Sequence, residues 1–167
     1  MWKIRIFFLC FVLLNSIELM SQKVNSKTYD MLLSSLLSHE AEEIDIWDAK
    51  KMDSAIFIDS RKQAEYEVSH IPKAVWVGYE NPNLESLEKL DKETPLIIYC
   101  SVGYRSEKIS LQLEKKGFKK VYNLYGGIFE WVNQGNEVVD NEGKTTDKVH
   151  AYNLLWGVWL TNGEKVY

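Results

Sequence analysis

The sequence lacks an excess of basic residues, which limits the partners it can have. Its 20 lysines and arginines are outnumbered by 24 aspartates and glutamates, and the formal net charge at pH 7 is −4. Because proteins that bind nucleic acid usually carry a basic face, we expect no nucleic-acid partner. Histidine is scarce too: His39, His70 and His150 stand far apart, and no His-x-x-x-His pair suggests a metal site. We therefore expect no metal and no cofactor.

Long hydrophobic runs are also missing. The apolar run Ile6–Leu14 follows Lys3 and Arg5 and leads into a polar stretch that ends at Ser21-Gln22. As a helix it would rise about 14 Å, too little for a hydrocarbon core of about 30 Å. A charged head, a short apolar core and a small-residue exit are typical of a secretory signal peptide. We expect residues 1–21 to be removed and the protein to be exported, to the periplasm; the alternative is an uncleaved N-terminal membrane anchor.

Cysteine is nearly absent, with two in the chain. Cys10 lies in the segment that we expect to be cleaved, so Cys100 would remain alone. In an oxidising compartment most cysteines are paired in disulfides. A single thiol there either pairs between molecules or is reactive, unless it is an inert member of the core.

What the sequence does contain is an alternation of short apolar runs with amphipathic segments. Runs rich in β-branched and aromatic residues predict four strands, Ala55–Ser60, Ala74–Tyr79, Pro95–Cys100 and Lys120–Tyr125. Helices are predicted over residues 28–43, 61–70, 83–92, 106–117 and 127–135. Such alternation is typical of right-handed βαβ units, so we expect an α/β fold with a parallel sheet covered on both faces.

The C-terminal segment 136–167 differs from the rest of the chain. It is polar at first and then aromatic, and Asn162-Gly163 between apolar flanks predicts a hairpin turn. Trp156, Trp159 and Tyr167 would form an exposed apolar surface if the segment were detached. We therefore expect it to pack on the rest of the protein.

Cys100 is the candidate reactive residue because of its place in the predicted fold. It ends a predicted strand, and the loop after it leads to a helix that we expect to begin near Ser106, a good N-cap. Ligands of parallel sheets bind at this end of the strands. Loop amides and the helix dipole would lower the pKa of the thiol below about 8.5. Gly103 suits a tight loop, and Arg105 can add positive charge or pair with a carboxylate that braces it.

Three motifs carry a resemblance to a known family. The loop CSVGYRS, residues 100–106, resembles the active-site loop of single-domain rhodaneses, which are sulfurtransferases with the pattern Cys-x-x-Gly-x-Arg-Ser. Residues 58–74 and 122–131 resemble two further motifs of that family. The resemblance implies a rhodanese-like three-layer fold, a central parallel sheet flanked by helices, over residues 44–135. A helical segment 22–43 would precede this domain, and the aromatic extension 136–167 would pack on it.

The resemblance also implies a persulfide mechanism. The Cys100 thiolate would take the outer sulfur of thiosulfate, a polysulfide or a persulfide, and pass it to cyanide or a thiol acceptor. The substrate would be bound by the loop residues Ser101, Val102, Gly103, Tyr104, Arg105 and Ser106. Four residues of the upstream motif are interpreted as architectural: Asp59, Arg61, Glu65 and His70.

The chain departs from the family pattern at the loop. Many relatives carry Arg or Lys just after the cysteine, where this chain has Ser101 and then the apolar Val102, so a dianion such as thiosulfate loses a positive partner. Tyr104 stands where relatives often have a small polar residue, and its ring could select a donor or cover the pocket.

Two other classes of protein remain as alternatives. Tyrosine-phosphatase-type enzymes also use a loop from cysteine to arginine, but with five residues between them, whereas Cys100 and Arg105 enclose four. The shorter loop makes a smaller ring of amides, suited to one sulfur. The third class is a non-enzymatic binding module with the same fold.

Overall fold

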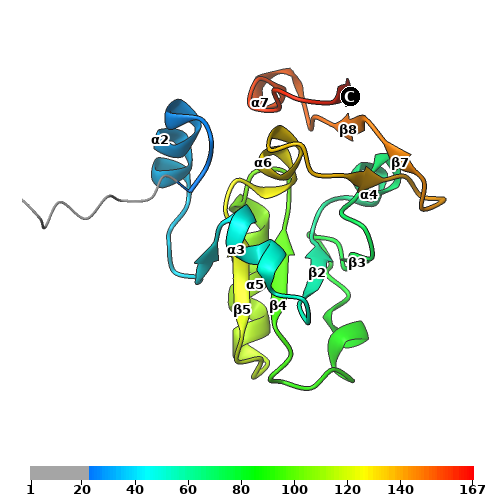
Figure 1. Ribbon diagram of the computed structural model, residues 1–167. Coiled ribbons are helices and arrows are strands. Elements are labelled where there is room, and N and C mark those ends of the chain that lie inside the picture. The colour runs from blue at the N-terminus through cyan, green and yellow to red at the C-terminus, as the bar shows by residue number, and fades with distance from the viewer. Residues whose placement is uncertain (1–22) are drawn as a thin grey trace, which may run out of the picture.

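A five-stranded parallel sheet forms the centre of the computed structural model, which describes residues 23–167 (Figure 1). The strands are β1 (Glu43–Ile44), β2 (Ile56–Asp59), β3 (Val75–Trp76), β4 (Leu96–Tyr99) and β5 (Val121–Leu124). Their order in the sheet is β1-β5-β4-β2-β3. Strand β4 lies in the middle and is buried along its whole length, which explains its continuous apolar sequence.

Helices cover both faces of this sheet, as the alternating pattern predicted. Helices α3 (Ile46–Lys51) and α6 (Gly127–Asn133) pack on one face, and the 3-10 helix η1 (Leu84–Leu87) and α5 (Tyr104–Lys115) pack on the other. The remaining helices of this part of the chain are α2 (Lys27–Leu36) and α4 (Gln63–Val68). Successive residues of β4 point to opposite faces, since Ile97 and Tyr99 join one core cluster while Leu96 and Ile98 join the other. The expected α/β fold is therefore confirmed.

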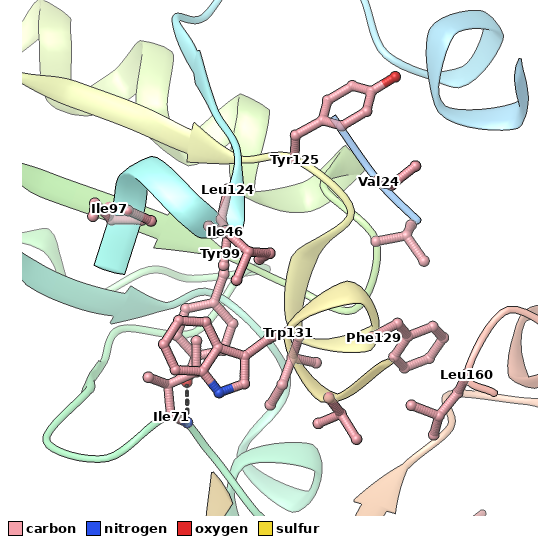
Figure 2. Close-up of a cluster of buried hydrophobic side chains, with 14 of the residues drawn as sticks. Val24, Ile46, Ile71, Ile97, Tyr99, Leu124, Tyr125, Phe129, Trp131 and Leu160 are labelled. Carbon is pink, nitrogen blue, oxygen red and sulfur yellow. Dashed lines mark hydrogen bonds between the residues drawn. The ribbon is translucent and has the colours of Figure 1, made fainter. Parts of the chain in front are cut away.

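The larger core cluster lies under α3 and α6 (Figure 2). Ile46 from α3 and Trp131 from α6 meet Ile97 and Tyr99 of β4 there. The Tyr99 hydroxyl accepts a hydrogen bond from the Ile71 amide at 3.1 Å, so its one polar group is satisfied although the side chain is fully buried. This packing fixes the end of β4, where Cys100 follows.

Several predicted elements have different bounds in the structure. The helix expected over residues 28–43 ends at Leu36, because Leu37 is extended and the chain turns toward β1. Only the single turn η1 forms within residues 83–92, and β3 has two residues where six were expected. Strand β1 and helix α3 were missed because both are too short to show a clear period.

The C-terminal extension contains β6 (Val138–Val139), β7 (Thr145–Thr146), β8 (Lys148–His150), α7 (Leu154–Gly157) and β9 (Glu164–Val166). Strands β8 and β9 pair in parallel, with α7 between them. The hairpin predicted at Asn162-Gly163 is therefore wrong: the dipeptide makes a turn into β9, but the paired strands run in the same direction.

This extension packs against the core and against the N-terminal helix. Val149 and Leu160 are fully buried, and the Trp159 ring stacks on Tyr29 of α2 at 5.4 Å between centroids and 14° between planes. Tyr167 remains 58% exposed, so the expectation that it would be buried is wrong. Helices α2 and α7 both lie beyond the carboxyl ends of the strands, near α6 (Figure 1).

The signal peptide expected over residues 1–21 and Cys10 lie outside the described residues. Within residues 23–167, no helix combines the length and the apolar character needed to cross a bilayer.

Candidate active site

Cys100 directly follows β4 and is 1% exposed. The next helix, α5, begins at Tyr104 with Gly103 as its N-cap, two residues earlier than predicted from Ser106. The reason is that Gly103 has φ +118°, a left-handed conformation open to glycine, which turns the chain sharply into the helix. Ser106 therefore lies in the first turn, where its hydroxyl donates to the Gly103 carbonyl at 3.0 Å.

The surroundings of the Cys100 sulfur favour the thiolate. The Gly103 amide donates to Sγ at 3.1 Å. Burial alone would raise the pKa of Cys100, but the charge of Arg105, the Ser106 hydroxyl and the amides of Ser106 and Gly103 outweigh it and lower the pKa below the usual value. These surroundings favour the thiolate, which is the nucleophilic form of a cysteine.

Alkylation of Cys100 by iodoacetamide should follow a pH profile with a midpoint below that of an ordinary thiol. Because the pKa of Cys100 is lowered, the reactive thiolate is already populated at lower pH. The rate of alkylation rises with pH until the thiol is fully deprotonated. Arg105→Gln should move the midpoint upward, because the positive charge is lost. Lys108→Gln removes the same charge from elsewhere in α5 and should leave the midpoint in place; an equal shift in both variants would contradict a specific role for Arg105.

The N-terminus of α6 holds the backbone of the loop in place. The amides of Ile128 and Phe129 donate to the carbonyls of Cys100 and Ser101 at 2.9 and 3.1 Å. A Cβ on Gly127 would lie 2.5 Å from the Cys100 carbonyl oxygen, so only glycine permits this approach. Because the two carbonyls bond to α6, the loop is free to present amides to the sulfur.

Glu65 reaches the site directly, although the sequence suggested only an architectural role. Its carboxylate accepts two hydrogen bonds from Arg105, at 2.6 and 2.7 Å, and one from the Ser101 hydroxyl at 3.1 Å. Burial would raise the pKa of Glu65, but the charges of Arg105 and Arg61 lower it, so the carboxylate is ionised. Arg105 therefore pairs with a carboxylate that braces the loop, one of the two roles that the sequence suggested.

The other residues of the upstream motif support the loop after β2. Arg61 forms a buried ion pair with Asp59 at 2.7 Å and donates to the Ser69 carbonyl at 2.6 Å. The His70 ring stacks on Tyr66, with ring centroids 3.8 Å apart. These contacts join β2 to the segment that follows α4 and do not involve the sulfur.

Cys100 lies at the bottom of a pocket of about 400 Å³. Four of the predicted loop residues line it, namely Ser101, Val102, Tyr104 and Arg105, while the Gly103 amide bonds to the sulfur and Ser106 lies in the first turn of α5. Leu36 of α2 and two residues of the extension, Tyr152 and Trp156, also line it. Sequence reasoning missed these three because no local pattern shows which distant segments fold over a loop.

A metal centre has no ligand set in the part of the chain that the structure describes. Across residues 23–167, no three His, Cys, Asp or Glu side chains are grouped so that they could hold a metal ion.

Fold and site together define an α/β protein with a buried cysteine of lowered pKa in the loop at the carboxyl end of a parallel strand. Residues 43–134 match the sequence model of the Rhodanese-like domain. The chain belongs to this family, as the three motifs predicted.

Similar proteins include enzymes of two kinds. A thiosulfate sulfurtransferase of Coxiella burnetii is 32% identical over 96 residues, which cover 58% of this chain and 89% of that protein. A tRNA uridine(34) hydroxylase of Hamiltonella defensa is 38% identical over 102 residues. The match covers 58% of this chain but only 27% of the hydroxylase, so the chain corresponds to about a quarter of that enzyme.

Solved structures share the fold. The BH2092 protein of Bacillus halodurans superposes with a TM-score of 0.54 at 28% identity, over 70% of this chain and 86% of that one. A polysulfide-sulfur transferase of Wolinella succinogenes gives a TM-score of 0.53 at 22% identity, over 68% and 88% of the two chains. At that identity the second likeness shows the fold alone.

Proposed function

We propose that the protein is a sulfurtransferase that carries a sulfane sulfur as a persulfide on Cys100. The environment of the Cys100 sulfur is the main observation that supports this proposal. The sulfur lies at the bottom of a pocket, accepts a hydrogen bond from the Gly103 amide at 3.1 Å, and has a lowered pKa. The sulfurtransferase activity named for the Coxiella burnetii relative supports it.

The reaction takes place in two displacement steps at sulfur. In the first, the Cys100 thiolate attacks the outer sulfur of the donor, and the bond from that sulfur to the rest of the donor breaks. With thiosulfate the leaving group is sulfite, which departs with the bonding electron pair. In the second, a thiolate or cyanide attacks the outer sulfur of the persulfide, and Cys100 leaves as a thiolate. No net oxidation occurs, and no cofactor takes part.

The loop supplies what both steps need. The groups that stabilise the thiolate, the Gly103 and Ser106 amides and the Arg105 charge, also stabilise the negative charge of the persulfide. They are held in place by the Glu65 carboxylate and by α6, so they require no rearrangement during transfer.

Steady-state transfer tests the proposal. Incubation with thiosulfate or inorganic polysulfide and with cyanide should yield thiocyanate in proportion to the amount of protein, and dithiothreitol in place of cyanide should yield sulfide. Protein alkylated by iodoacetamide at Cys100 is the control and should be inactive. Absence of transfer from every donor would favour a binding module, and hydrolysis of an aryl phosphate through Cys100 would favour a phosphatase.

A further inference from the structure

We infer that the pocket selects an organic persulfide or thiosulfonate as the donor over thiosulfate. In such a donor the sulfane sulfur is attached to an apolar organic group and the molecule carries a single negative charge, whereas thiosulfate is a dianion. This inference rests on the proposed function, because it concerns the donor of the same site. With an organic persulfide, Cys100 takes the outer sulfur and the organic thiolate leaves with the bonding electrons. With a thiosulfonate the leaving group is a sulfinate.

The first observation is that the pocket has little positive charge to offer. Within residues 23–167, Arg105 is the one cationic side chain that lines it. Both terminal nitrogens of its guanidinium are bonded to Glu65, at 2.6 and 2.7 Å, and Tyr152 lies against its face at 5.1 Å from the ring centroid. Its charge is therefore compensated, and three of its five N–H donors are already used, because Nη2 also donates to the Ser101 hydroxyl at 2.9 Å. The pair of donors that could hold a second anion in a bidentate way is thus taken by Glu65.

Neighbouring residues do not make up for this. Ser101 and Val102 occupy the two positions after the cysteine, and the Ser101 hydroxyl donates to Glu65 at 3.1 Å. Burial lowers the pKa of nearby His150, and Arg61 and Arg105 lower it further, outweighing Glu65, so its ring is neutral at pH 7. A dianion that binds next to the Cys100 thiolate would lose its hydration there. It would gain the loop amides as its main partners, which makes its binding unfavourable.

The second observation is an apolar wall in the lining of the pocket that holds Cys100. Leu36, Tyr152 and Trp156 form this wall together with Val102 of the loop. The pocket volume of about 400 Å³ lies within the range of small-molecule sites, which are predominantly apolar with a few placed polar groups. An organic group attached to the sulfur would bury apolar surface here, whereas thiosulfate has none to bury.

Local hydrogen bonds fix the backbone that carries the two aromatic side chains of the wall. Tyr152 has φ +64°, a left-handed conformation that is unfavourable for any residue except glycine, and its amide donates to His150 Nδ1 at 3.0 Å. Strain of this kind persists where the surroundings enforce it and is concentrated at binding sites. The Trp156 amide donates to the Asn153 side chain at 3.0 Å, which fixes the start of α7. The wall is thus a built feature of the extension.

The test compares three donors under one assay. Persulfide formation on Cys100 is timed with thiosulfate, methanethiosulfonate and benzenethiosulfonate, and each rate constant is divided by that of the same donor with a free low-molecular-weight thiolate. We expect benzenethiosulfonate to exceed methanethiosulfonate by about tenfold or more, from burial of the ring, and thiosulfate to be the slowest.

Variants of the wall separate pocket effects from donor chemistry. Trp156→Ala and Leu36→Ala should each reduce the benzene-to-methane ratio, because each removes apolar surface against which the ring of the donor would be buried. Leu155→Ala alters the adjacent residue of α7, which is 74% exposed and does not line the pocket, and should leave the ratio unchanged.

The outcomes distinguish the two proposals. If thiosulfate is the fastest donor, or if the normalised benzene-to-methane ratio is near one, the inference about the donor is wrong although sulfur transfer stands. If no donor loads the protein with sulfur, the proposed function itself fails. Melting curves for each variant show whether a loss of rate reflects unfolding, and the comparison of donors on the unaltered protein does not depend on any variant.

Discussion

Replacement of Cys100 by serine should abolish sulfur transfer and leave the fold intact. A serine hydroxyl stays protonated at neutral pH and cannot form a persulfide, so we expect a loss of at least about 10⁴-fold, of the order found when a covalent nucleophile is removed. The side chain keeps nearly the same shape and can still accept the hydrogen bond from Gly103. The free energy of unfolding should therefore change by no more than about 1 kcal/mol. Thiocyanate formation and thermal melting measure the two effects.

Cys10→Ser in the uncleaved, full-length chain is the matched control, because it removes the other thiol of that chain. It should transfer sulfur at the rate of the unaltered protein. If Cys100→Ser retained activity while Cys10→Ser lost it, the account of the site would be wrong.

Gly127→Ala should impair the site although it changes no side chain that contacts the Cys100 sulfur. The new Cβ would lie 2.5 Å from the Cys100 carbonyl oxygen and 2.7 Å from the Ser101 carbonyl, so α6 and the loop must move apart. A displacement of about 1 Å at a catalytic group can lower a rate about 100-fold, and we expect a loss of that size. The melting temperature should fall as well, because two buried hydrogen bonds are weakened.

Gly135→Ala is the control that separates the clash of a Cβ with the loop from the cost of a left-handed backbone conformation. Gly135 ends the same helical segment with φ +76°, but a Cβ there meets nothing within 4 Å. It should cost only the left-handed strain of about 1–2 kcal/mol and leave transfer within about twofold. Equal losses of activity in the two variants would show that the contact between α6 and the loop is not what holds the sulfur site.

Much of the fold could be predicted from the sequence because its strongest signals are local. The apolar run of β4 and the helical spacing of α5 come from neighbouring residues, and their alternation predicts a parallel sheet. Elements of two or three residues gave no such signal: β1 forms only because β5 offers a parallel partner, and β8 and β9 pair across the intervening helix. The Asn162-Gly163 turn was recognised, but its local signal says nothing of the direction of the strand it serves.

The part of the site that lies in one segment could be predicted from the sequence, whereas the contacts between distant segments could not. Cys100, Gly103 and Arg105 lie in one loop, and their arrangement follows from a strand that leads into a helix. The ion pair between Glu65 and Arg105 joins α4 to α5, and the apolar wall joins α2 to the extension. Such contacts depend on packing between distant segments, for which the aromatic character of residues 136–167 was only a general indication.

Intact-mass measurement of the protein after incubation with a sulfane donor shows whether Cys100 takes up sulfur. The account predicts a gain of ~32 Da, located at Cys100 by peptide fragmentation and removed by cyanide or dithiothreitol, because a persulfide is a reversible modification of a thiolate. Protein with Cys100→Ser should gain nothing under the same conditions. An unchanged mass with every donor, or an added sulfur located away from Cys100, would contradict the account.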